Sequence, residues 1–110
     1  MSLPKRTLNA FANVAASQTD ASLVAAVSEK IIRVCAVVFV AGDTSTDATF
    51  NTKGAGAGVA ISALFANAAN GGAVLPFNDE GWFETDLGEA LTVTTGAGDT
   101  TGVQIVYKLV

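Results

Sequence analysis

Alternation of hydrophobic and polar residues is clearest in the last third of the chain. One alternating set is Leu91, Val93 and Thr95, and a second, after the loop GAGDTTG, is Val103, Ile105, Tyr107 and Leu109. Period-two alternation is typical of a strand with one buried face. Antiparallel partners keep a constant index sum, so pairing Thr95 with Val103 would place both sets on one face. The pattern predicts a β-hairpin made of residues 90–95 and 102–110.

The segment IIRVCAVVFV predicts a strand that is buried on both faces. It is rich in β-branched residues, and from residue 34 onward both alternating sets are apolar. In a two-sheet sandwich one face meets the opposite sheet, and the other needs a different cover, for which a neighbouring subunit is the simplest choice. We therefore expect a subunit interface made of one alternating set: Val34, Ala36, Val38 and Val40.

Other segments are shorter or ambiguous. ATFNT predicts a return strand with Phe50 pointing inward. VAISALFANAAN, residues 59–70, has helical spacing that Gly71 could end, but Asn70-Gly71 between two apolar runs is a strong hairpin signal, so two strands are favoured. TDASLVAAVSEK, residues 19–30, could be a helix capped by Asp20, and a strand is again favoured.

Together these segments predict an all-β protein. Turn residues separate candidate strands at residues 10–16, 22–27, 31–41, 47–52, 59–66, 73–77, 82–85, 90–95 and 102–110. Regularly spaced short strands are typical of a single-domain antiparallel β-sandwich, and about eight of them favour a jelly roll, with an immunoglobulin-like sandwich as the alternative. We expect an N-terminal arm over residues 1–10 and the sandwich over 11–110.

Composition and charge argue against several functions. The net charge is −4, only 15% of residues are charged, and the few basic residues form no stripe, which disfavours nucleic-acid binding. There is no histidine and only one cysteine, Cys35, so the commonest general base and metal ligand is missing. The longest apolar run, residues 34–41, is far shorter than the ~20 residues that span a bilayer. We expect a non-enzymatic protein with no cofactor and no membrane partner.

The segment LPFNDEGWFETDLGEAL, residues 75–91, is the strongest candidate for chemistry. It surrounds the only tryptophan, Trp82, with five carboxylates: Asp79, Glu80, Glu84, Asp86 and Glu89. A glycosidase needs two facing carboxylates in a walled cleft, and so short a chain offers little material for one. Two acidic turns around a strand WFET, with Trp82 or Phe83 anchoring the core, explain the same residues. We therefore assign no catalytic, metal or cofactor residues.

Two further motifs invite ligand interpretations that we do not favour. GAGAGVA, residues 54–60, has neither the sixth-position glycine of a dinucleotide fingerprint nor the GK[ST] of a P-loop. GDTSTD, residues 42–47, has too few carboxylates for a dedicated calcium loop. Both are better explained as ordinary loops.

Several stretches resemble small single-domain virion proteins of tailed bacteriophages. The similarity covers residues 15–107 and runs through AASQTDASLVAAVSEKIIRV, TFNT, AANGGAVLPFNDEGWFETDLGEALTVTTGAG and VQIVY. The order and spacing of NGG, LPFN, GWFET and GEALTVTTGAG carry the likeness. It implies a β-sandwich or jelly-roll capsid decoration (cement) protein, or a related head or tail accessory protein, often trimeric. No catalytic or ligand-binding residues come with it.

From this resemblance we expect a structural protein on the capsid exterior, made in the host cytoplasm. It would form a homotrimer and bind the major capsid protein. The arm residues expected to contact the capsid are Leu3, Pro4, Lys5 and Arg6. The alternative is a receptor- or glycan-binding module of a tail fibre or spike, in which Trp82 and its neighbouring carboxylates would bind a sugar.

Overall fold

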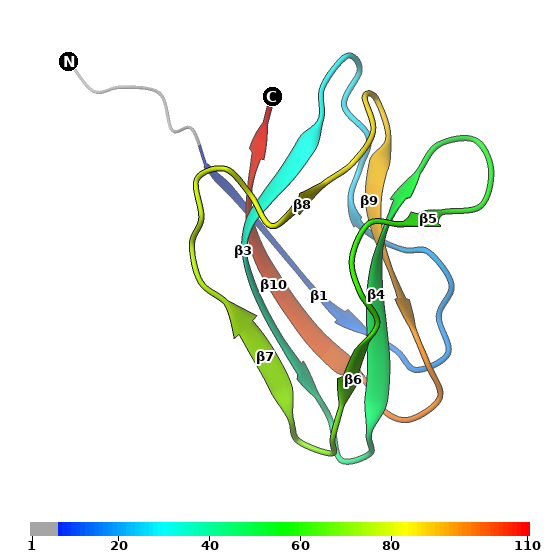
Figure 1. Ribbon diagram of the computed structural model, residues 1–110. Helices are drawn as coiled ribbons and strands as arrows, with labels where there is room; N and C mark the ends of the chain where they lie inside the picture. Colours follow the sequence, from blue (N-terminus) through cyan, green and yellow to red (C-terminus); the bar gives the residue numbers. More distant parts are fainter. Residues whose placement is uncertain (1–6) are drawn as a thin grey trace.

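The computed structural model, which describes residues 7–110, contains ten β-strands (Figure 1). The described part of the chain contains no helix. The strands are β1 (Leu8–Val14), β2 (Ala21–Val24), β3 (Ile32–Ala41), β4 (Thr46–Lys53), β5 (Val59–Ala60), β6 (Phe65–Asn67), β7 (Gly72–Leu75), β8 (Phe83–Glu84), β9 (Ala90–Thr95) and β10 (Thr101–Leu109).

The strands form two antiparallel sheets packed face to face. Sheet A has the order β1-β10-β3-β7, with β8 also paired to β3, and sheet B has the order β2-β9-β4-β5, with β6 also paired to β4. The short strands β5 and β6 pair with different parts of β4, so together they occupy one strand position in sheet B. In the same way β7 and β8 pair with different parts of β3 and occupy one position in sheet A. The result is two sheets of four positions each.

This arrangement confirms the all-β sandwich and has jelly-roll connectivity. We count β5 with β6 as one strand position and β7 with β8 as another. The chain then changes sheet between every two successive positions except between β4 and β5. Eight positions in two facing sheets are the jelly-roll pattern. In an immunoglobulin-like sandwich the last two strands lie in one sheet, whereas β9 and β10 lie in different sheets here.

A cluster of phenylalanine rings joins the two sheets at the centre of the core. Phe39 of β3 and Phe83 of β8 come from sheet A, and Phe50 of β4 and Phe65 of β6 come from sheet B. The ring centroid of Phe50 lies 6.2 Å from that of Phe39, 6.2 Å from that of Phe65 and 5.1 Å from that of Phe83. Phe50 is fully buried, as the sequence predicted.

The prediction that residues 90–95 and 102–110 form a hairpin is wrong, but the prediction of which side chains point inward is correct. Leu91, Val93 and Ile105 are all buried in the core. However, β9 pairs with β2 and β4, while β10 pairs with β1 and β3. The two strands face each other from opposite sheets, and each lies in the middle of its own sheet. Alternation identifies the buried side of a strand, but it does not distinguish a coplanar neighbour from a facing one.

The same distinction corrects the other predicted hairpins. Residues 59–70 contain strands rather than a helix, but the predicted strand 59–66 is two short pieces, β5 and β6. Asn70, with φ 56°, turns the chain out of sheet B into sheet A, since β6 pairs with β4 and β7 with β3. The return strand β4 likewise pairs in the sheet opposite β3. Residues 19–30 contain the strand β2, as favoured.

Candidate interaction face

Three adjacent rows of residues on the outward side of sheet A contain no charged side chain, and we call this surface the outer face. A charged row, Lys108, Arg33 and Glu84, borders it at the end of the sheet that carries β8. Strand register brings its residues into three rows across the sheet. The central row has a side chain on each of four strands. Of the two rows beside it, one contains two glycines and the other has only three members. The rows are Phe11, Gln104, Val38 and Val74; then Asn13, Gly102, Val40 and Gly72; then Asn9, Val106 and Ala36.

Four large apolar members of these rows are unusually exposed. The exposed fractions are 77% for Phe11, 44% for Val38, 47% for Val40 and 66% for Val74. They come from β1, β3 and β7, so segments far apart in the sequence contribute to one surface. A contiguous apolar surface of this kind is typical of a site that contacts another molecule.

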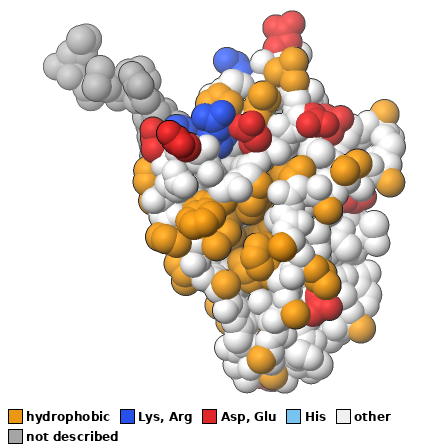
Figure 2. All heavy atoms as spheres, viewed as in Figure 1, with side chains coloured by type: hydrophobic (Ala, Val, Ile, Leu, Met, Phe, Trp, Pro, Cys, Tyr) orange, Lys and Arg blue, Asp and Glu red, His pale blue; other side chains and the backbone are white. Residues whose placement is uncertain are grey.

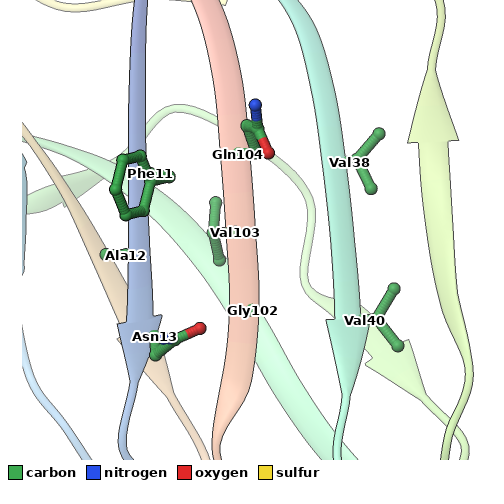
Figure 3. Close-up of a pocket in the computed structure, with 8 residues that line it drawn as sticks. All are labelled: Phe11, Ala12, Asn13, Val38, Val40, Gly102, Val103 and Gln104. Atoms are coloured by element: carbon green, nitrogen blue, oxygen red, sulfur yellow. The ribbon is translucent and has the colours of Figure 1, made fainter.

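The outer face is hollowed where glycine interrupts its rows. Gly102 lies between Asn13 and Val40, and with no side chain there a hollow of about 260 Å³ opens between Phe11 and the two valines of β3 (Figure 3). A second hollow, of about 430 Å³, lies on the other side of Val38 and is bordered by Val74, Phe77 and Val106. Both hollows are shallow and open, so they suit protruding side chains of a partner surface better than an enclosed small molecule.

Three of the four predicted interface residues lie on this face, and the fourth does not. Ala36, Val38 and Val40 point outward, whereas Val34 is fully buried in the core. The reason is a register shift: Val106 pairs with Ala36 but Tyr107 pairs with Val34, which leaves Cys35 without a partner on β10. This β-bulge reverses the alternation, so Val34 and Val37 share the inward side.

The bulge also places Cys35 in the interior. Its side chain is buried, and this desolvation raises the pKa of the thiol above its usual range. Burial favours the neutral thiol, which is neither a nucleophile nor a metal ligand. The structure therefore gives Cys35 a packing role.

The acidic segment forms two turns around a very short strand, as predicted. Gly81 and Gly88 adopt positive φ values of 86° and 73° in these turns. Of the two aromatic candidates, Phe83 is the core anchor because its ring stacks on Phe50. Trp82 points outward, is 43% exposed, and donates a hydrogen bond from Nε1 to the carbonyl oxygen of Pro76 at 2.7 Å.

Three of the five carboxylates of this segment bind separate neighbouring groups instead of converging on one point. Asp79 forms an ion pair with Lys108, and Glu84 forms one with Arg33, each at 2.9 Å. Glu89 accepts a hydrogen bond from the Thr52 hydroxyl at 2.8 Å. Within residues 7–110 no three acidic, cysteine or histidine side chains are grouped closely enough to hold a metal ion. The geometry shows structural roles for these three acids.

A hollow of about 460 Å³ lies beside Trp82, at the open side of the sandwich. It is bordered by Trp82, directly before β8, by Phe83 of β8, and by Ile61 and Phe65 from the facing side. Figure 2 shows hydrophobic side chains gathered on this side of the molecule and charged side chains concentrated near the end that carries β8. The exposed indole therefore borders an apolar depression.

The turn GDTSTD is organised by a carboxylate from a distant loop. Asp99 accepts hydrogen bonds from the backbone N–H groups of Asp43, at 2.8 Å, and Thr100, at 2.7 Å. These bonds stabilise the carboxylate and lower the pKa of Asp99 below its ordinary value. The turn thus uses its polar groups to connect the 42–47 and 96–100 loops.

Two important members of the outer face, Phe11 and Val74, were not identified from the sequence. The alternation of residues 8–14 could have assigned Phe11 to one side of a strand, but only strand pairing places it beside Val38. The predicted arm residues Leu3, Pro4, Lys5 and Arg6 lie outside the described residues, and β1 begins at Leu8, within the predicted arm. No helix in the described part of the chain is long and apolar enough to cross a membrane.

Comparison of the chain with protein-family models, curated proteins and solved structures finds no match.

Proposed function

We propose that this protein is a structural, non-enzymatic subunit of a phage particle that associates through the outer face of sheet A. The observation that carries the proposal is the uncharged outer face, on which Phe11, Val38, Val40 and Val74 are exposed on three of the four strand positions of sheet A. Burying such a face removes apolar area from water without stranding charges. A stable contact of this kind needs about 800 Å² per partner.

The virion assignment rests on the resemblance of residues 15–107 to small phage virion proteins, and the jelly-roll sandwich is compatible with it. In this proposal the subunits form a homotrimer that decorates the outside of the capsid. The outer face mediates packing between subunits. Residues 3–6, with the positive charges of Lys5 and Arg6, contact the major capsid protein.

Replacing Val38 by lysine tests the face contact. Val38 lies at the centre of the outer face, and burying a lysine there would require desolvation of an unpaired charge, so the dissociation constant of the oligomer is expected to rise at least about tenfold. Sedimentation velocity measures the oligomer, and cosedimentation measures binding to capsids that lack the protein.

Val59→Lys is the matched control for this experiment. Val59 is also an exposed strand valine, but it lies on β5 of sheet B, away from the outer face, so association should be unchanged. A wild-type protein that is a stable monomer without affinity for such capsids contradicts the proposal, as does equal association of Val38→Lys and wild type.

A second candidate function, the glycan-binding module, is favoured by the position of Trp82. The exposed indole is held in place by its bond to Pro76 and borders an apolar hollow, an arrangement suited to stacking on a sugar ring. Trp82→Ala should abolish binding on an array of bacterial surface polysaccharides while leaving the melting temperature nearly unchanged. If no polysaccharide binds the wild type, or if the variant unfolds, this candidate fails.

A further inference from the structure

Strand β1 is the only edge of the sandwich without a protective feature among the described strands. Exposed edges invite pairing with another chain, and proteins usually protect them by short length, charge, proline or a bulge. The edge strand β2 has four residues and an irregular register, and the two opposite edges are each split into two short pieces. By contrast, β1 has seven residues that pair with β10 in unbroken register.

The composition of β1 leaves this edge open as well. Its sequence, LNAFANV, has no charged residue and no proline, and no strand within residues 7–110 pairs with its other side. Its central side chain, Phe11, is among the most exposed large hydrophobic side chains of the described chain. An open, uncharged edge of this length has the properties of a pairing site.

The sequence of β1 is nearly the same in both directions about Phe11. Asparagine stands two residues to either side of Phe11, alanine one residue to either side, and the ends are Leu8 and Val14. In an antiparallel pair of two such strands centred on Phe11, Asn9 therefore lies opposite Asn13 of the partner subunit, and Ala10 opposite the partner's Ala12. Every position meets an identical or similar residue.

We propose that two copies of the chain join edge to edge by antiparallel pairing of β1 about Phe11. Such a contact is isologous, with one two-fold axis through the strand pair. On the outward side it brings together the two Phe11 rings, and each asparagine amide, which both donates and accepts, can bond its counterpart. Sheet A then continues from one copy into the next.

This contact is separate from packing through the outer face and does not require it. It uses the backbone groups at the free side of β1, whereas the face contact uses side chains that project from the sheet. The two copies would present their outer faces as one uncharged surface of doubled width. The pairing therefore adds a second, two-fold interface to the assembly.

Charge placed at Asn9 and Asn13 tests both the pairing and its register. Both side chains are exposed, and they lie four positions apart on one strand, about 13 Å, so they affect each other little within a chain. In the paired strands, Asn9→Lys with Asn13→Lys puts like charges opposite each other twice. Asn9→Lys with Asn13→Glu puts opposite charges together twice.

The comparison is made in the Val38→Lys protein, in which the face contact is weakened, by sedimentation velocity at several concentrations. The Val38→Lys protein should be a dimer, the lysine–glutamate variant should remain one, and the lysine–lysine variant should dissociate with a constant at least about tenfold higher. Equal melting temperatures verify that both variants fold.

A monomeric Val38→Lys protein overturns the edge pairing, and so does equal dissociation of the two charge variants. The face proposal fails separately, if Val38→Lys and wild type associate alike, because that comparison does not involve β1.

Discussion

Replacing Phe50 by alanine is expected to lower the free energy of unfolding by about 3–5 kcal/mol. Phe50 is fully buried, and its ring contacts Phe39 and Phe83 of sheet A as well as Phe65 of its own sheet. Truncation leaves a cavity at the point where the sheets are held together. Urea denaturation followed by the fluorescence of Trp82, the only tryptophan, measures the change.

Phe77→Ala provides the control for the loss of a phenyl ring. Phe77 is exposed on the loop after β7, so its replacement should change the free energy of unfolding by no more than about 0.5 kcal/mol. If Phe50→Ala destabilises the protein no more than Phe77→Ala does, the ring cluster does not hold the sheets together as described.

Gly72→Ala is expected to destabilise the protein by about 1–3 kcal/mol, the range for forcing extra volume into a packed site. Gly72 pairs with Val40 at the start of β7, and an added Cβ would overlap the carbonyl oxygen of Phe39 on the neighbouring strand. Because the obstacle is backbone, relief requires β7 to move away from β3. The same denaturation experiment measures the loss.

Gly56→Ala is the matched glycine control. A Cβ at this position would meet no atom within 4 Å, so the substitution should not destabilise the folded protein. Because alanine lowers the conformational entropy of the unfolded chain, the free energy of unfolding should stay the same or rise by about 0.4–1 kcal/mol. If the two substitutions change the free energy of unfolding equally, the close approach of β7 to β3 does not exclude a side chain at Gly72.

The sequence predicted which side chains turn inward better than it predicted which strands pair. Alternation depends only on a strand having one buried face and one solvent-exposed face, so the inward orientation of Leu91, Val93 and Ile105 was predicted correctly. Pairing depends on segments far apart in the chain: β10 lies between β1 and β3, which no local pattern indicates. Short loops between apolar runs suggested hairpins, but here they cross from one sheet to the other.

The candidate interaction face was predicted only in part for the same reason. Val38 and Val40 follow from the excess apolar residues of their own strand. Val34 was misplaced because the bulge at Cys35 adds a residue that alternation does not reveal. Phe11 and Val74 belong to the face only through register with β10 and β3. For the acidic segment, two adjacent aromatic residues must point to opposite sides, and packing against Phe50 selects Phe83.

The position of the last two strands has a consequence for the timing of folding during synthesis. Strand β10 fills the gap between β1 and β3, and β9 fills the gap between β2 and β4. A nascent chain that stops before residue 90 therefore lacks an inner strand in both sheets and has β1 and β2 without their partners. Because contacts between distant segments form late and slowly, the sandwich can close only after residues 90–109 have left the ribosome. Until then, the unprotected β1 is exposed along both of its sides.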